Sequence, residues 1–288
     1  MDDTDKSLAT AQKSFINHLK QKQKASATIL AYGKDIAQLV EFLTKKQITQ
    51  VTTVTSEQIE EFKQYLGENK YLTKSISRKL NSIKTFFRYL KTEGVIAENP
   101  AAFISHPKYE LSPPRILSKM EYRALRDAAR DDARVAAIIE ILLQTGMRIG
   151  ELSRLELGDI SEKEINIKPF ESHPARTVPL NQATKKALDR YLNLRPQTKS
   201  KSVFVTKTGR PLLIRNIRTI INRFFRTADV KGATINSLRH TFIAHQLMSG
   251  ASVVLIQKLA GHKRLSTTEK YLDLVKDKIE ETPKLETL

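Results

Sequence analysis

Arginine, histidine and tyrosine are residue types that bind oxyanions, move protons and act as nucleophiles, and they recur in three short segments of this chain. In the first segment, Thr145–Leu152, Arg148 follows Gly146 by two residues and precedes Glu151 by three. Because residues i and i+3 share a helix face, Glu151 could orient the guanidinium of Arg148. The same spacing is also typical of a weak ion pair on a surface helix.

The second segment, Ile235–Thr241, places Asn236 and Arg239 at the same i, i+3 spacing. This spacing predicts that the two side chains share one face of a helix, with Leu238 and Phe242 on its buried side. An ordinary solvated face is the alternative, and for a single arginine it is the more common case.

The third segment, residues 259–271, contains Gly261, His262 and Tyr271. Gly261 is predicted to end a helix, and Tyr271, nine residues after His262, is predicted to lie about two turns into the next one. Each residue alone has a plain structural interpretation. A histidine after a helix end is often only a hydrogen bonder, and a helical tyrosine is often a core residue with its hydroxyl at the surface.

Composition limits the partners and the chemistry. The net charge of +18 indicates a polyanionic partner, although a basic surface without such a partner is the alternative. Nucleic acid is favoured over membrane because the chain has no tryptophan and no basic amphipathic segment with aromatic anchors. The absence of cysteine excludes disulfides, a thiolate nucleophile and cysteine-ligated metals. With no apolar run long enough to cross a bilayer and an acidic N-terminus, we expect a soluble, cytoplasmic protein.

The elements that must position the three segments are mostly helices. Apolar periodicity predicts a bundle of four helices in residues 1–106, and Pro107, Pro113 and Pro114 mark a linker. Residues 107–288 form the second predicted domain, whose first helix follows Ser118. The fold class is therefore mainly α with a small β-sheet. The predicted helices are 8–23, 25–45, one beginning at Thr55-Ser56, 75–93, one after Ser118, 134–145, 184–194, 213–228, 237–249, 253–259 and 267–278. The predicted strands are 164–169 and 176–180, with a possible third at 203–205.

Taken together, the segments follow the order Arg148, Arg239, His262, Tyr271, and this order resembles the tyrosine recombinase/phage integrase family, specifically its Xer-type members. The stretch Arg176-Thr-Val-Pro-Leu180 is also similar, and the resemblance covers nearly the whole chain. It implies an N-terminal helical core DNA-binding domain (1–106) and a mostly helical catalytic domain (107–288), which together would form a clamp around a DNA duplex.

The resemblance also implies a mechanism. Tyr271 would attack a DNA phosphodiester and leave a 3′-phosphotyrosyl link with a free 5′-hydroxyl, while Arg148 and Arg239 hold the phosphoryl oxygens. His262 would bond the phosphate or assist proton transfer, and Glu151 would support the arginines. No cofactor and no metal are implied.

Two positions depart from the family pattern. Asn236 stands where a histidine is usual; it can donate a hydrogen bond to phosphate but cannot transfer a proton. A lysine that protonates the leaving oxygen is expected on the strand pair, but ungapped alignment places Glu171 there. Lys168 is the only lysine of residues 165–178 and is predicted for this role. The neighbouring His240 is predicted to be a packing residue.

The implied partners are a double-stranded DNA recombination site and further recombinase subunits. The family acts as a tetramer on two sites, here a homo-tetramer or a hetero-tetramer with a related recombinase, and residues 273–288 would dock on a neighbour. The role would be chromosome dimer resolution or mobile-element integration and excision. The alternative is a DNA-binding protein that cleaves weakly or not at all. A covalent protein–DNA complex distinguishes the two, since only the enzyme forms one.

Overall fold

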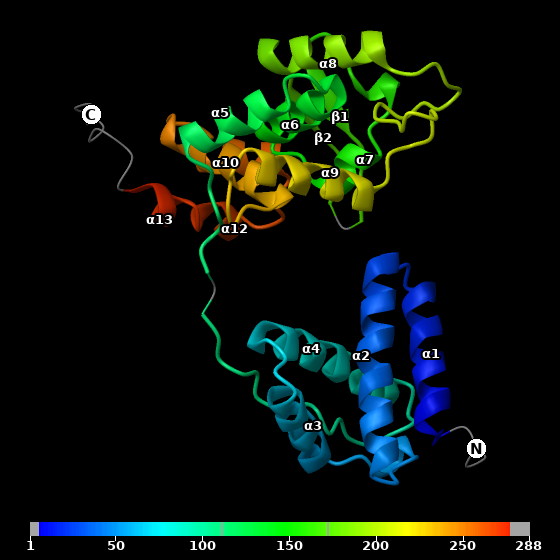
Figure 1. The fold of residues 1–288 in the computed structure, drawn as a ribbon. Helices are drawn as coiled ribbons and strands as arrows, with labels where there is room; N and C mark the ends of the chain where they lie inside the picture. Colours follow the sequence, from blue (N-terminus) through cyan, green and yellow to red (C-terminus); the bar gives the residue numbers. More distant parts are fainter. Residues whose placement is uncertain (1–5, 111, 172, 277–288) are drawn as a thin grey trace, which may run out of the picture. The chain divides into compact units, whose positions relative to one another are not determined.

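The computed structural model describes residues 6–110, 112–171 and 173–276. The chain divides into two compact units, residues 1–111 and 112–288 (Figure 1). Each unit has a hydrophobic core of its own.

The first unit contains the four predicted helices, in positions close to those predicted. Their packed faces bury phenylalanines from three of the helices, namely Phe15, Phe62, Phe86 and Phe87. The predicted helix start at Thr55 is also present, because the Thr55 N–H donates to Oε1 of Gln58 over 2.9 Å. The helices are α1 (Leu8–Gln21), α2 (Ser26–Lys45), α3 (Ser56–Glu68) and α4 (Thr73–Thr92), with a 3₁₀ turn at Val51–Thr53.

The second unit is mostly helical, with one small sheet (Figure 1). Its first helix begins as predicted, since Ser118 and Glu121 form a capping box. The elements that follow the linker are α5 (Lys119–Ala128), α6 (Ala133–Thr145), α7 (Ile149–Ser153), β1 (Glu164–Ile167), β2 (Arg176–Pro179), α8 (Gln182–Leu194), α9 (Ile214–Thr227), α10 (Ile235–Met248), α11 (Val253–Ala260), α12 (Ser266–Glu269) and α13 (Leu272–Val275), with a 3₁₀ turn at Leu157–Asp159.

The two strands pair antiparallel, with Ile165 opposite Val178, and both of these side chains are buried. This confirms the predicted strand pair. The possible third strand at 203–205 is not a strand. Val205 makes only an isolated bridge with Pro211, and its N–H donates to the hydroxyl of Tyr191 instead of to a neighbouring strand.

The predicted helix over 267–278 is also wrong. The chain forms two single-turn helices, α12 and α13, and Tyr271 lies between them. The Tyr271 N–H donates to the Thr268 carbonyl, and the Leu274 N–H donates to the Tyr271 carbonyl. These i to i+3 bonds tighten the backbone and interrupt the α-helical ladder. Residues 277–288, which include most of the predicted docking segment, lie outside the described residues.

Among the helices of the described ranges, none combines the length and the apolar character that crossing a membrane requires.

Candidate active site

Arg148 is the N-cap residue of α7, directly after the turn that ends α6. Gly146 makes this turn with a left-handed φ of 60°, and a Cβ there would collide with the ring of Phe242. The carboxylate of Glu151 accepts from the Arg148 N–H over 2.8 Å and from Nη1 over 3.1 Å. Glu151 therefore holds both the backbone and the side chain of Arg148, which is the contact that the i, i+3 spacing predicts.

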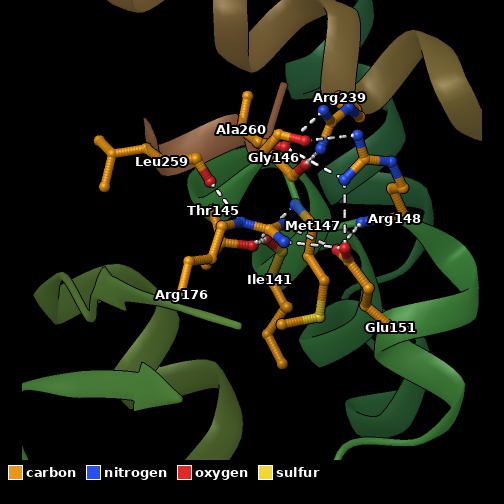
Figure 2. A network of polar contacts seen from close by, with 11 residues as sticks. Ile141, Thr145, Gly146, Met147, Arg148, Glu151, Arg176, Arg239, Leu259 and Ala260 are labelled. Atoms are coloured by element: carbon orange, nitrogen blue, oxygen red, sulfur yellow. Dashed lines mark hydrogen bonds and ion pairs between the residues drawn. The ribbon is translucent and has the colours of Figure 1, made fainter. Parts of the chain in front are cut away.

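Arg176, on β2, is a second partner of Glu151. Its Nη1 and Nη2 donate to the two carboxylate oxygens over 2.8 and 2.7 Å, and its Nε donates to the Leu259 carbonyl over 2.7 Å (Figure 2). Burial by itself would raise the pKa of Glu151, but the hydrogen bonds and charge of Arg176, together with Arg148, lower it to about 2. The carboxylate is thus ionised, and it joins β2, α7 and the end of α11.

Arg239 projects from α10 and lies at the ends of two other helices. Its Nη1 donates to the carbonyl of Gly146, at the end of α6, and its Nη2 donates to the carbonyl of Ala260, at the end of α11, over 2.6 Å. Nη1 of Arg148 donates to the same Ala260 oxygen over 3.2 Å (Figure 2). The guanidinium groups of Arg148 and Arg239 therefore meet at one oxygen atom.

Burial is the main influence on the charge of these arginines. It lowers the pKa of Arg239 to about 9, with further lowering by the positive charges of Arg148 and Arg176. Burial likewise lowers the pKa of Arg148, while Glu151 opposes that change. Arg239 remains protonated at neutral pH, so the cluster presents positive charge from both guanidinium groups.

Tyr271 is buried between two histidine rings. Its hydroxyl lies 2.6 Å from Nδ1 of His240, and its ring stacks on that of His262 with centroids 6.3 Å apart. Nδ1 of His262 lies 2.8 Å from the Thr268 hydroxyl. Burial raises the pKa of Tyr271, and the charge of Arg239 partly offsets this rise. The phenol is thus protonated in this arrangement, and it can donate to His240.

Both histidines are held in the neutral form. Burial lowers the pKa of His240, and Arg239 lowers it further. Burial, followed by the charges of Arg239, Arg148 and Arg176, lowers the pKa of His262 to about 3. A neutral imidazole can accept a hydrogen bond or a proton, so His240 is suited to take a proton from Tyr271. The pKa of about 3 makes His262 a weak base, so that ring is better suited to hydrogen bonding.

Two of the predicted site residues do not join this cluster. Asn236 is exposed and lines a hollow beside α9 with Arg218 and Asn222, although it was predicted to share a face with the buried Arg239. The two side chains differ in environment because Asn236 borders that hollow, whereas Arg239 packs against the ends of α6 and α11. Lys168 pairs with Glu156 and Asp159, over 2.5 and 3.1 Å, and more than half of its side chain is exposed.

Sequence reasoning missed two members of the cluster. Arg176 appeared only as part of a strand motif, and its partners Glu151 and Leu259 lie 25 and 83 residues away. His240 was predicted to be a packing residue, and it contacts Tyr271 across 31 residues. The local signal for His240 was its place directly after Arg239, close to the polar residues Ser237 and Thr241.

We expect replacement of Arg176 by glutamine to lower the free energy of unfolding at pH 7 by about 3 kcal/mol, because it removes a partner from a buried carboxylate. The depressed pKa of Glu151 contributes stability above its ordinary pKa of 4.5, and this stability is lost as the pH falls towards 2. Arg176→Gln should therefore also flatten the loss of stability in acid. Urea unfolding at several pH values measures both effects.

Arg126→Gln is a matched control, because Arg126 makes a similar two-bond pair with Glu140 outside the cluster, at 2.5 and 2.9 Å. That pair is more exposed, so its loss should cost only about 1 kcal/mol. Equal destabilisation by the two variants would contradict the structural role of Arg176.

Comparison with known proteins gives the class of the chain. Residues 115–278 match the phage integrase family, and residues 13–94 match the phage integrase N-terminal SAM-like domain. The chain therefore belongs to the phage integrase family of tyrosine recombinases. Within it, the chain is similar to Xer-type proteins, which confirms the resemblance seen in the sequence.

Two relatives and one solved structure illustrate the match. Tyrosine recombinase XerC of Anoxybacillus flavithermus is 32% identical over 91% of this chain and 92% of its own length. Tyrosine recombinase XerD of Staphylococcus saprophyticus is 31% identical over 90% of this chain and 92% of its own length. The structure of a lambda integrase dimer bound to a COC′ core site covers 98% of this chain and all of its own, with a TM-score of 0.78. At 18% identity, the last comparison supports the fold.

Proposed function

We propose that this recombinase cuts and rejoins DNA strands at a specific site through a 3′-phosphotyrosyl link on Tyr271. The observation that carries the proposal is the meeting of Arg148 and Arg239 at the Ala260 oxygen, 3.2 and 2.6 Å from their nitrogens. Two guanidinium groups that converge on one oxygen can also share the oxygens of a phosphate.

The arginines keep donors for such a phosphate. Each guanidinium has five N–H groups, and the bonds recorded among the described residues use three of those on Arg148 and two on Arg239. Donors fixed in advance stabilise the charge that builds up on the phosphoryl oxygens during attack. Because the covalent intermediate conserves the energy of the broken bond, rejoining needs no nucleotide cofactor.

Tyr271 supplies the nucleophile, and His240 is placed to take its proton. Their 2.6 Å contact and the neutral state of His240 support this direction of transfer. His262, stacked on Tyr271, would bond the phosphate or assist the transfer. Asn236 as a phosphate donor and Lys168 as the acid remain predictions, since both lie outside the cluster.

The partner that we propose is a double-stranded DNA site, bound by a tetramer that joins two such sites in the cytoplasm. The net charge of +18 supports a polyanionic partner. Further support comes from the related lambda integrase, whose structure is a dimer on a core site. The biological role would be chromosome dimer resolution or mobile-element integration and excision.

A second candidate function is DNA binding with little or no cleavage. Two observations favour it: Asn236 cannot transfer a proton, and Lys168 is already paired with two carboxylates. DNA binding without cleavage, however, does not explain why Arg148 and Arg239 converge on one oxygen.

Capture of covalent DNA separates the two functions and also finds the site. The chain is expressed in cells, purified under denaturing conditions, and the DNA that stays attached is sequenced. That sequence then defines a nicked duplex that traps the cleaved state. We expect a band that survives a denaturing gel, with the nucleotide on the peptide of Tyr271. A shift seen only on a native gel would instead support the second candidate.

A further inference from the structure

The loop between β1 and β2 carries a histidine that the mechanism above does not use. Nδ1 of His173 is buried and has no hydrogen-bond partner among the described residues. An unpaired buried polar atom is costly, and at a functional site the missing partner can be the substrate.

Both sides of His173 are anchored on α7, the helix that Arg148 begins. On one side, Phe170 and His173 exchange two backbone hydrogen bonds of 3.1 and 2.9 Å. The ring of Phe170 covers Gly150 so closely that a Cβ there would collide with it, and the guanidinium of Arg154 lies 4.5 Å from the ring centre. This packing ties the loop to the middle of α7.

On the other side, Arg176 follows His173 by three residues. Its guanidinium donates two hydrogen bonds to the carboxylate of Glu151. Because Phe170 packs on Gly150 and Arg176 bonds Glu151, the loop holds His173 next to the arginine cluster. The loop between β1 and β2 therefore carries a histidine in the region where the family pattern predicts a lysine.

The charges around His173 belong to the same cluster. Burial lowers its pKa most, and the positive charge of Arg148 lowers it next, against the opposing effect of Glu151 on the same helix. Lys263, after α11, and Arg239, on α10, lower it further. His173 in turn is one of the groups that lower the pKa of His262. The imidazole therefore shares the electrostatic environment of the proposed phosphate site.

Lys168, the residue predicted for the acid role, is situated differently. Its ammonium pairs with Glu156 and Asp159, which would have to release it before it could reach a DNA strand. His173 has no such competing side-chain partner among the described residues.

We propose that His173, rather than Lys168, is the general acid that protonates the leaving 5′ oxygen, an inference that rests on the proposed function. In the cleavage step the Tyr271 oxygen bonds to phosphorus and the bond from phosphorus to the 5′ oxygen breaks. The imidazolium of His173 gives its proton to that oxygen, which leaves as a hydroxyl, while the phenol proton passes to His240. In the rejoining step each proton returns.

Binding of the DNA phosphate prepares His173 for this role. The phosphate adds negative charge among Arg148, Arg239 and Lys263, and this offsets the positive charges that disfavour the imidazolium. Because the acid must carry its proton, the cleavage rate should fall as the pH rises through the pKa of His173 in the complex.

The test compares two leaving groups on the captured DNA site. One nicked duplex has the natural 5′ oxygen at the scissile bond, and the other has sulfur there, which leaves as a thiolate and needs no acid. Four proteins are compared: the unmodified chain, His173→Asn, Lys168→Ala and His245→Asn. His245 is an exposed histidine on α10 and serves as the matched control. Thermal unfolding and DNA affinity are measured for each, so that a folding defect is recognised.

We expect His173→Asn to cleave the oxygen substrate about 100-fold more slowly than the unmodified chain and to match it on the sulfur substrate. His245→Asn should match it on both, and any slowing by Lys168→Ala should be the same on oxygen and sulfur. Selective slowing of Lys168→Ala on oxygen, or equal slowing of His173→Asn on both substrates, would overturn the role of His173. If the unmodified chain forms no covalent complex on either substrate, the proposed function itself fails.

Discussion

Replacing Tyr271 by phenylalanine is expected to abolish the covalent protein–DNA complex and leave DNA affinity nearly unchanged. The substitution removes the only atom that we propose to attack phosphorus, whereas binding depends on many contacts between basic side chains and phosphates. It also leaves Nδ1 of His240 without its 2.6 Å partner, so we expect a loss of about 1–3 kcal/mol in the free energy of unfolding. Denaturing gels, native gels and urea unfolding measure the three effects separately.

Tyr191→Phe is the matched control for this experiment. Tyr191 is a buried tyrosine of the same unit, and its hydroxyl bonds the backbone of Val203 and Val205 at 3.1 Å. Its loss should destabilise the fold to a similar degree and leave covalent complex formation intact. Adducts formed by Tyr271→Phe at the unmodified rate would rule out Tyr271 as the nucleophile.

Patterns among residues close in sequence predicted those parts of the site that are formed by contacts within one short segment. Gly146 and Gly261 both end helices in the left-handed conformation, with φ values of 60° and 64°. Glu151 bonds Arg148 three residues away, as the helical spacing requires. The helices of the first unit follow from apolar periodicity, because that unit buries one face of each helix.

The remaining parts depend on contacts between distant segments, which no local pattern encodes. Arg176 could be recognised only once β2 lay beside α7 and the end of α11. The buried position of Tyr271 follows from the break between α12 and α13, whereas periodicity predicted a continuous helix. Asn236 shares its helix with Arg239, but its side chain is exposed, whereas Arg239 is buried against the carbonyls that end α6 and α11.

One feature unites the cluster: three arginines bond the free carbonyls at the ends of two helices. The last carbonyls of a helix have no partner within it, and they carry partial negative charge. The carbonyls of Gly146, at the end of α6, and of Leu259 and Ala260, at the end of α11, accept these bonds (Figure 2). The Gly261 carbonyl accepts a further bond from Arg148. These hydrogen bonds fix the guanidinium groups, so the N–H groups that remain unused are also held in fixed positions.

This dual use predicts a large effect for Arg239→Lys. Lysine keeps the positive charge, but its single ammonium cannot serve the carbonyls of Gly146 and Ala260 and also bond a phosphate in the plane of a guanidinium. We expect the rate of covalent complex formation to fall about 100-fold or more, with little change in DNA affinity. Single-turnover cleavage of the trapped substrate, at saturating protein, measures the rate.

Arg195→Lys separates the loss of carbonyl bonds from the loss of phosphate contact. Arg195 bonds the carbonyls of Ser200, Ser202 and Val203 over 2.7 to 3.0 Å, in the same unit but outside the cluster. Its replacement should destabilise the fold about as much as Arg239→Lys and leave the cleavage rate unchanged. If both variants slowed cleavage in proportion to their loss of stability, Arg239 would act only as a support for the helix ends. A defect confined to Arg239→Lys would place its guanidinium on the reacting phosphate.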